Sequence, residues 1–559
     1  MHSVYKIFIS LALLLLVSSC SLLGIHFKVK NPKHAGAYPK ETKKLLLLGT
    51  RTKYRTCFDV HYYALNLNIN PEKKQVGGSV QINATVVTAF DTLQLDLYKN
   101  MKLTKIEVNG ESATYIRKEG AIFIHPAQNL QVGSNFSIQV WYNGKPITAK
   151  RPPWRGGSVW KHDKNKSPWD GVACETEGAS LWWPNKEDVA DEADSVDVNL
   201  TVPANLMAVS NGILKDSINN QNNTCTYKWH ISYPINNYNI TFYLGNLQLL
   251  KDVYISKTTG LHIPLNYYVL PYNYAKALPH FQQVKTYLAF YEEKFGPYPW
   301  PNDGFKLVES PFEGMEHQTA IAYGHGYKND YQGFDYIILH ETAHEWWGNS
   351  VTASDMADAW LHEGFASYTE ALYVERAQGY SAYLDYMYGQ RIFILNKRAV
   401  VRKRGIRYFD SSDEDIYNKG SWVLHSLRYV INNDSLFFNI IKTFRVENHQ
   451  KQILSETFVD VVNRLTNRNY NWFFNQYLYK RQAPILEYHW LGNYFYYRWT
   501  NVDPDFTKMP VEVIINGETY KIYPSLNTKY IPLTDYGGTY QFTSDDKAYY
   551  GFKLNKHLE

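Results

Sequence analysis

The segment His340-Glu-Thr-Ala-His344 has the residue types and spacing of a metal site. On an α-helix, residues i and i+4 share one face, so both imidazoles can reach one metal ion while Glu341 projects beside it. Ile337 and Ile338 precede the segment with helical spacing, and no proline interrupts it. The pattern predicts a helix-borne metal site with a carboxylate in the position of a general base.

A hydrolytic zinc site needs three protein ligands and one open position. Glu363 is the candidate third ligand, because the 18 residues between it and His344 resemble the spacing of gluzincin peptidases. Glu370 follows Glu363 by two helical turns on the same face. We predict that Glu370 accepts a hydrogen bond from a ligand histidine and so orients its ring.

The elements that must position these residues follow from the apolar periodicity. From about residue 56 to 250 apolar residues alternate with polar ones, as at Leu93, Leu95 and Leu97, which predicts strands. After Pro484 alternation returns. Between these regions the spacing is helical, with longer predicted helices at about 334–348, 358–378, 419–431 and 455–466.

The charge of the chain is unevenly distributed. The chain has 559 residues and a formal net charge of +5; residues 1–27 carry +1 and residues 28–55 carry +8, so the other 504 residues carry −4. The 45% content of hydrophobic residues excludes wholesale disorder, and four cysteines exclude a disulfide-framed scaffold. Because the basic excess is N-terminal, no nucleic-acid partner is expected.

The N-terminus is typical of an export signal. Lys6 precedes an apolar run from Ile7 to Val17, which is shorter than the roughly 20 residues that cross a bilayer. The run ends in Val17-Ser-Ser-Cys20, which resembles a bacterial lipobox, whose cysteine is lipidated and becomes the mature N-terminus. The alternative is an ordinary cleaved signal with an incidental cysteine.

We therefore predict a signal peptide over residues 1–19 and a basic, lipid-anchored linker over residues 20–50. Pro32, Gly36 and Pro39 argue against regular structure in the linker. Ser21 after the lipidated Cys20 resembles the pattern of outer-membrane retention. The expected location is the cell envelope of a bacterium, on the outer membrane and facing the periplasm.

The metal region as a whole resembles the aminopeptidase N and leukotriene hydrolase family of zinc aminopeptidases. The resemblance lies in the block from His340 to Asn349, which continues as Glu-Trp-Trp-Gly-Asn, and in Trp360-Leu-His-Glu363-Gly-Phe-Ala. It extends over roughly residues 55–480, with further motifs in the expected order.

The first of these motifs lies upstream of the histidines. Glu313-Gly314-Met315-Glu316-His317 resembles the family's Gly-x-Met-Glu-Asn exopeptidase motif, whose glutamate binds the α-amino group of the substrate. The resemblance gives that role to Glu316 and places Gly314 and Met315 in the substrate site. Glu313 and His317 depart from the motif, which puts the strand geometry and the neighbouring pocket in question.

Two other segments complete the resemblance. Glu175, in Ala-Cys-Glu175-Thr-Glu-Gly, matches the position of a second amine-binding residue. Tyr417, in Tyr417-Asn-Lys-Gly, matches the family's catalytic tyrosine. Two converging acids would distinguish an N-terminal ammonium from an internal peptide bond.

The resemblance implies a multidomain α+β fold with three parts. These are an N-terminal antiparallel β domain over residues 51–254, a thermolysin-like α-rich catalytic domain over 255–480 and a small C-terminal β domain over 481–559. It also implies one Zn²⁺ ion held by His340, His344 and Glu363. The expected activity is removal of N-terminal residues from peptides with a free N-terminus, with Glu341 as general base and Tyr417 stabilising the oxyanion.

Three alternatives remain open. A thermolysin-type zinc endopeptidase shares the histidines and the helix-borne glutamate, although Glu316, Glu175 and Tyr417 argue against it. An epoxide hydrolase activity like that of leukotriene hydrolase is the second alternative, and a lipoprotein with an inactive peptidase fold is the third. A cluster of acids from Glu187 to Asp194 is a further hypothesis: it could attract cationic peptide termini.

Overall fold

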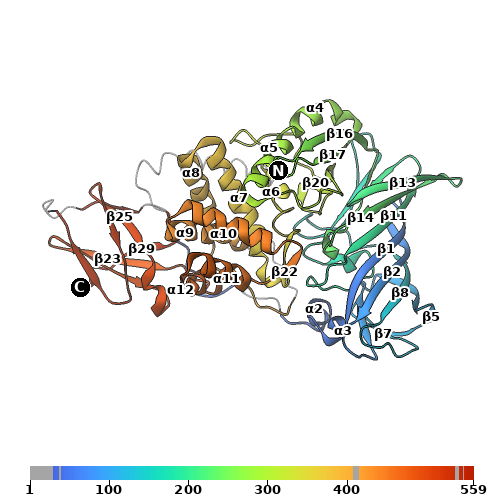
Figure 1. Ribbon diagram of the computed structural model, residues 1–559, viewed down its shortest axis with the longest axis horizontal. Helices are drawn as coiled ribbons and strands as arrows, with labels where there is room; N and C mark the ends of the chain where they lie inside the picture. Colours follow the sequence, from blue (N-terminus) through green and yellow to red (C-terminus); the bar gives the residue numbers. More distant parts are fainter. Residues whose placement is uncertain (1–28, 37–39, 407–413, 535–539, 545–546, 559) are drawn as a thin grey trace.

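The computed structural model describes residues 29–36, 40–406, 414–534, 540–544 and 547–558. Figure 1 shows an elongated arrangement in which a helical region separates an N-terminal β region from a C-terminal one. The three-part α+β prediction is confirmed. The predicted signal peptide and Cys20 lie outside the described residues. Among the described residues, no helix combines the length and the apolar character needed to cross a membrane.

The N-terminal domain is built on an eight-stranded sheet in which several inner strands alternate buried residues with less buried ones. In spatial order the strands are β13 (Ile213–Asn220), β14 (Thr224–Ile231), β11 (Ser195–Pro203), β1 (Phe58–Asn70), β2 (Gln75–Val86), β8 (Asn135–Gly144), β4 (Met101–Val108) and β5 (Glu111–Ser112). The sheet departs from the antiparallel prediction at one place, because β1 and β11 pair in parallel, with Leu65 opposite Val198.

Two smaller sheets complete this domain, and β10 leads directly to Glu175. One contains β12 (Met207–Val209), β15 (Tyr243–Gly245), β10 (Pro168–Ala173) and β9 (Gly157–His162); the other contains β3 (Leu93–Asp96), β7 (Ala121–His125) and β6 (Thr114–Lys118).

The linker prediction differs from the structure in its secondary structure. Helix α2 (Lys43–Gly49) forms after Thr42, whose side chain accepts a hydrogen bond from the Leu45 backbone, and the short helix α3 (Lys53–Thr56) follows. The prolines lie before α2 and therefore do not interrupt it.

The domain predicted to be catalytic, here called the catalytic domain, starts with a five-stranded sheet. Its order is β16 (Gln248–Ile255), β17 (His262–Val269), β18 (Phe305–Glu309), β20 (Ile321–Tyr323) and β19 (Gly314–Met315). The sheet therefore begins at Gln248, seven residues before the predicted boundary. Strand β19 forms an antiparallel edge, with Met315 opposite Ala322.

Helices cover this sheet and make up the rest of the domain (Figure 1). They are α4 (Tyr274–Phe281), α5 (Gln283–Phe295), α6 (Tyr336–Ala343), α7 (Trp360–Gln378), α8 (Tyr380–Arg391), the π-helical turn η5 (Asp415–Lys419), α9 (Gly420–Ile431), α10 (Asp434–Glu447), α11 (Ser455–Thr466) and α12 (Asn471–Tyr479). The short strands β21 (Val351–Ala353) and β22 (Lys451–Ile453) pair between them.

The start of α6 is fixed by Asp335. One of its carboxylate oxygens accepts the backbone N–H groups of Ile337 and Ile338, and the other accepts the hydroxyl of Tyr323 at 2.7 Å. This cap satisfies donors that the first helical turn leaves unpaired. The same residue therefore ties the helix that carries both histidines to strand β20.

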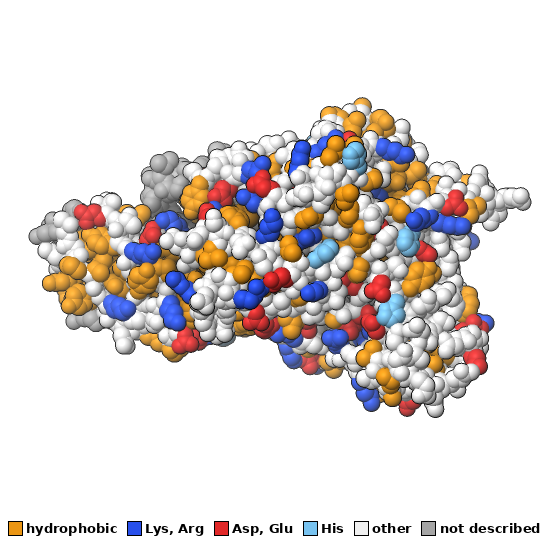
Figure 2. Space-filling model, in the orientation of Figure 1, with side chains coloured by type: hydrophobic (Ala, Val, Ile, Leu, Met, Phe, Trp, Pro, Cys, Tyr) orange, Lys and Arg blue, Asp and Glu red, His pale blue; other side chains and the backbone are white. Residues whose placement is uncertain are grey.

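The described part of the C-terminal domain forms two sheets. The first contains β27 (Lys529–Pro532), β24 (Tyr494–Thr500), β23 (Ile485–Leu491) and β29 (Gly551–Leu554), and the second contains β26 (Glu518–Ile522), β25 (Val511–Ile515) and β28 (Phe542–Ser544). Figure 2 shows apolar side chains gathered over this domain, while positive and negative side chains are interspersed along the helical region. The domain is joined to α12, whose Tyr477 hydroxyl donates to the Tyr549 carbonyl.

Candidate active site

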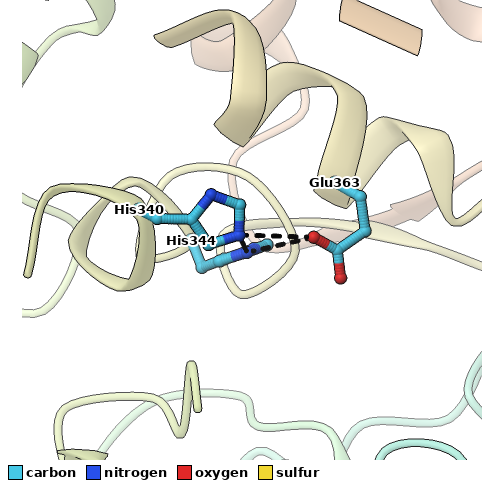
Figure 3. A group of neighbouring side chains, drawn as sticks. All are labelled: His340, His344 and Glu363. Atoms are coloured by element: carbon cyan, nitrogen blue, oxygen red, sulfur yellow. Dashed lines mark hydrogen bonds and ion pairs between the residues drawn. The ribbon is translucent and has the colours of Figure 1, made fainter. Parts of the chain in front are cut away.

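His340, His344 and Glu363 converge on one point (Figure 3). The Nε2 atoms of His340 and His344 lie 3.1 Å apart, and each lies 3.5 Å from Oε2 of Glu363. The histidines come from α6 and its C-terminal cap, and Glu363 comes from the first turn of α7. Three ligand atoms from two neighbouring helices thus form a nearly equilateral triangle.

The other ring nitrogens are already engaged, which fixes the orientation of both rings. Nδ1 of His340 donates to Oε1 of Glu370 at 2.5 Å, and Nδ1 of His344 donates to the carbonyl of Trp347 at 2.9 Å. Glu370 is held in turn by the hydroxyl of Tyr386. Both histidines consequently present Nε2 to the centre of the triangle, as metal-ligating histidines do.

These residues fit a zinc ion. Tetrahedral zinc with ligands at about 2.0–2.1 Å separates its ligand atoms by about 3.3 Å. The observed separations of 3.1 and 3.5 Å lie on either side of that value. Two imidazoles and one carboxylate are also a donor set of hydrolytic zinc sites, which leave the fourth position open.

Glu341 lies beside the triangle and against strand β19. A β-carbon on Gly314 would stand 2.4 Å from Oε1 of Glu341 and 3.0 Å from Cγ2 of Ile337. Glycine at position 314 therefore leaves the space that the Glu341 carboxylate occupies. Burial raises the pKa of the Glu341 carboxyl to about 8.

Glu316 and Glu175 line the same cavity as the ligand triangle. Glu316 is 4% exposed, and its Oε1 accepts the hydroxyl of Tyr238 at 3.2 Å. The side chain of Asn349, five residues after His344, donates to the backbone carbonyl of Glu316 at 2.9 Å. Burial raises the pKa of the Tyr238 phenol well above its ordinary value, and the charges of Glu316 and Glu175 raise it further. Both carboxylates therefore lie close enough to Tyr238 for their charges to act on the same phenol.

The departures at Glu313 and His317 leave strand β19 intact. Gly314 pairs with Tyr323, and the backbone of Gly324 donates to the Glu313 carbonyl at 2.7 Å. The His317 ring is fully buried, and burial lowers its pKa to about 3. Its Nδ1 lies 2.6 Å from the hydroxyl of Tyr243, and His317 is not among the described residues that line the cavity. Glu313 does line the cavity.

Tyr417 is carried by the π-helical turn η5. Its ring stacks on that of His340 with centroids 6.4 Å apart and an interplanar angle of 26°. The turn can approach α7 because glycines meet there: a β-carbon on Gly364 would stand 2.9 Å from Cα of Gly420. Burial, followed by the charge of Glu363, raises the pKa of the Tyr417 phenol well above its ordinary value.

All ten of the site residues predicted in the described part of the chain line one cavity of about 920 Å³. They are Glu175, Gly314, Met315, Glu316, His340, Glu341, His344, Glu363, Glu370 and Tyr417. The remaining predicted residue, Cys20, lies outside the described residues.

Sequence reasoning missed several cavity residues. Tyr386, Gln390 and Tyr549 belong to α8 and the C-terminal domain, and Val29 and Lys30 to the predicted linker. These residues carry no motif. The family motifs include Asn349, but they did not indicate that its side chain donates to the Glu316 carbonyl.

The structure does not support the hypothesis that the acidic cluster attracts cationic peptide termini. The cluster consists of Glu187, Asp188, Asp191, Glu192 and Asp194. Glu187 is 6% exposed and accepts the backbone N–H of Ser180, and Asp191 is paired with Lys186. Asp188 is paired with Arg51 at 3.1 Å. None of the five acids is among the described lining of the cavity. Of the remaining two acids, Glu192 accepts the side-chain amide of Gln452 at 2.7 Å and Asp194 is exposed.

Known proteins resemble this chain most clearly around the site. It is 26% identical over 255 residues to endoplasmic reticulum aminopeptidase 1 of Mus musculus, covering 42% of this chain and 27% of the relative. It is 28% identical over 192 residues to aminopeptidase B of Homo sapiens, covering 32% and 29%. The chain thus spans less than a third of the length of these two relatives.

A solved structure shares the fold over a larger part of the chain. An M1 zinc metallopeptidase mutant from Deinococcus radiodurans, bound to a Tyr-Ser-Ala substrate, superposes with a TM-score of 0.63 and 20% identity. The match covers 76% of this chain and 95% of that one.

Residues 280–477 match the family described as the peptidase family M1 domain. The part of this chain that carries both histidines, Glu363 and Tyr417 is therefore a peptidase family M1 domain, as the motifs predicted.

Proposed function

We propose that this chain is a zinc-dependent aminopeptidase that removes residues one at a time from peptides with a free N-terminus. The observation that carries the proposal is that one cavity is lined both by the ligand triangle and by Glu316 and Glu175. A zinc peptidase needs the triangle alone, whereas the adjacent buried acids add recognition of a cation. The relatives named as aminopeptidases support the same activity.

His340, His344 and Glu363 would hold the ion. Bound there, Zn²⁺ supplies a Lewis acid for the scissile carbonyl and lowers the pKa of a water molecule. Glu370 keeps the His340 ring in place through the 2.5 Å bond to Nδ1. The arrangement leaves Nε2 free of a proton and directed at the ion.

Glu341 and Tyr417 act on the reacting groups. Glu341 takes a proton from the attacking water and passes it to the leaving amine. The Tyr417 hydroxyl donates a hydrogen bond to the oxyanion that develops on the carbonyl oxygen. Both side chains line the cavity next to the ligand triangle.

Glu316 and Glu175 hold the ammonium group of the first residue. The hydroxyl of Tyr238 orients the Glu316 carboxylate, and Asn349 fixes the backbone of Glu316 to the segment after His344. An internal peptide bond brings no positive charge to this place and would leave the buried acids unpaired. Cleavage is therefore directed to the first bond.

The proposal is tested with amino-acid anilides and short peptides, each in a free and an N-acetylated form. We expect hydrolysis of the free forms, loss of activity with a chelator and recovery on adding Zn²⁺. Equal cleavage of acetylated peptides would instead support a thermolysin-type endopeptidase. Bound zinc with no turnover of any peptide would support an inactive fold.

We also propose that Cys20 carries a lipid anchor in the outer membrane. The support is the lipobox-like sequence and its apolar leader. Val29 lines the cavity, and the nine residue steps between Cys20 and Val29 can span at most about 30 Å. The anchor would therefore keep the cavity close to the membrane.

Metabolic labelling with a fatty acid tests the anchor. The label should appear on the native chain and not on Cys20→Ser. Unlabelled native protein in the soluble fraction would contradict the proposed anchor.

A further inference from the structure

The segment of residues 29–36, here called the strap, is bound to the junction between the catalytic and C-terminal domains. The Asn31 side chain both donates to and accepts from the backbone of Ala483, at 3.2 and 2.9 Å. Arg481 donates to the carbonyls of Pro32, at 2.6 Å, and Lys33, at 3.0 Å. These four bonds attach the strap to the connection between α12 and β23.

The strap is also bound to one wall of the cavity. The side chain of Asn396 donates to the Lys30 carbonyl at 2.7 Å, and the backbone of Gly36 donates to the Lys397 carbonyl at 2.7 Å. Val29 packs so closely on Gly551 that a β-carbon there would stand 3.0 Å from Cβ of Val29. Val29 and Lys30 themselves line the cavity.

The wall under the strap is connected to the turn that carries Tyr417. The Asp415 carboxylate accepts the backbone N–H of Leu395 at 2.6 Å and that of Lys397 at 3.2 Å. Asp415 begins η5, two residues before Tyr417. The strap therefore contributes to a hydrogen-bonded unit that reaches the reacting groups.

The cavity that is lined by Glu316, Glu175 and the ligand triangle also reaches the strap, because Val29 and Lys30 line it as well. Asn349, five residues after His344, donates to the Glu316 carbonyl, whereas Glu370 accepts from Nδ1 of His340. Next to Glu370 lie Tyr386 and then the end of α8, where the Lys30 ammonium donates to the Ile392 carbonyl at 3.0 Å. A peptide with its ammonium at Glu316 and its first carbonyl at the triangle can therefore continue within the same cavity to the strap.

The charges along the cavity single out Lys30. The described lining contains eight carboxylic acids and two cations, Lys30 and Arg391. Arg391 is buried, donates to the Tyr550 carbonyl and lies over the ring of Trp422. Lys30 is exposed, and the bond to Ile392 uses one of the three donors of its ammonium.

We propose that the strap forms the wall for the part of the peptide that follows the scissile bond, and that Lys30 binds a carboxylate there. That carboxylate is the C-terminus of a short peptide. The proposal rests on the proposed aminopeptidase activity and adds a preference for one class of substrate. It assigns a specificity role to a segment that the sequence presents as a tether.

The test compares Lys30→Met with Lys33→Met, which removes the same charge from the same strap. Lys33 is exposed and is not among the described residues that line the cavity. Each variant is assayed on a tripeptide with a free C-terminus, on the same tripeptide as its amide, and on an amino-acid anilide. An exposed ion pair contributes up to about 1 kcal/mol, or about fivefold in affinity.

We expect Lys30→Met to lower kcat/KM for the free tripeptide by about two- to fivefold, through KM, with the amide and the anilide unchanged. Lys30→Arg should keep the preference, Lys33→Met should match the parent, and added salt should weaken the preference. Equal effects of Lys30→Met on all three substrates, or no effect on any, would overturn the role of Lys30. If the parent hydrolyses none of the three, both this proposal and the proposed function are wrong.

Discussion

The space that the Glu341 carboxylate occupies exists because residue 314 has no side chain. A β-carbon on Gly314 would stand 2.4 Å from Oε1 of Glu341. The contact joins strand β19, which directly precedes Glu316, to helix α6, which carries His340 and is capped by His344. Gly314 therefore helps to set the distance between Glu316 and the histidines.

Gly314→Ala should fold but impair catalysis. The clashing atom is the end of a flexible side chain, so the fold can accommodate the methyl group by moving the carboxylate. Displacement of a catalytic group by about 1 Å can cost up to about 100-fold in rate. We expect kcat to fall by about 10- to 100-fold while the zinc content and the unfolding temperature stay near the parental values. Parental kcat would show that the Glu341 position is not critical.

Glu341→Gln should separate metal binding from turnover. The amide keeps the size of the side chain but cannot accept the proton of water. Loss of a general base costs about 10²–10⁴-fold in kcat. Zinc content, measured by atomic absorption, should remain at one ion per chain. Near-normal turnover would remove Glu341 from its assigned role.

Glu316→Gln should chiefly affect the recognition of free amines. A charge-assisted hydrogen bond contributes about 1.5–3 kcal/mol, so kcat/KM for free peptides should fall by about 10- to 100-fold. The ratio of free to acetylated cleavage should fall with it. Glu313→Gln, which removes the same charge from the same edge of the cavity, should change that ratio far less. Equal effects of the two variants would mean that only the total negative charge matters.

Glu370→Gln should weaken metal binding without removing a ligand. Glu370 accepts the Nδ1–H of His340 at 2.5 Å, and loss of such a partner typically costs about 10- to 100-fold in metal affinity. Tyr386→Phe, which deletes the hydroxyl that contacts Glu370, should show the same effect in smaller degree. Competition with a chelator of known affinity measures both. Unchanged zinc affinity in both variants would show that other contacts orient the His340 ring.

Asp170 should make stability depend on pH in the neutral range. The residue is 2% exposed, and burial raises its pKa from 3.8 to about 7. The folded state then favours the protonated form, so stability is highest below about pH 4 and falls as pH rises through about 7. Asp170→Asn removes this loss and keeps an oxygen for the Lys161 backbone N–H.

We expect Asp170→Asn to be more stable than the parent by about 2–4 kcal/mol at pH 8 and about equal to it near pH 4. Urea unfolding at both pH values measures the difference. Asp216→Asn, on the exposed strand β13, is the matched control and should behave like the parent. A constant difference between Asp170→Asn and the parent across this pH range would contradict the assignment.

Local sequence predicted the helices well where one face is apolar and the ends are marked. The predicted segments at 358–378, 419–431 and 455–466 correspond closely to α7, α9 and α11. Helix α2 was missed because its Leu-rich run is short and follows a proline-containing segment. The parallel pairing of β1 with β11 could not be predicted, because a strand's alternation does not identify its partner.

The sequence by itself determined the chemistry of the site. Residues four apart on a helix share a face, so the helical spacing already predicted that the His340 and His344 side chains point to the same place. Motif order supplied Glu363, Glu316, Glu175 and Tyr417, and the family match over residues 280–477 confirmed the family prediction.

Only the tertiary structure decided what surrounds these groups. Contacts between residues more than three hundred positions apart, such as Lys30 with Ile392 and Asn31 with Ala483, leave no periodic signal in a single sequence. The same holds for Tyr549, which reaches the cavity from the C-terminal domain. Spacing along a helix is fixed by local geometry, whereas the cavity walls depend on how distant segments pack.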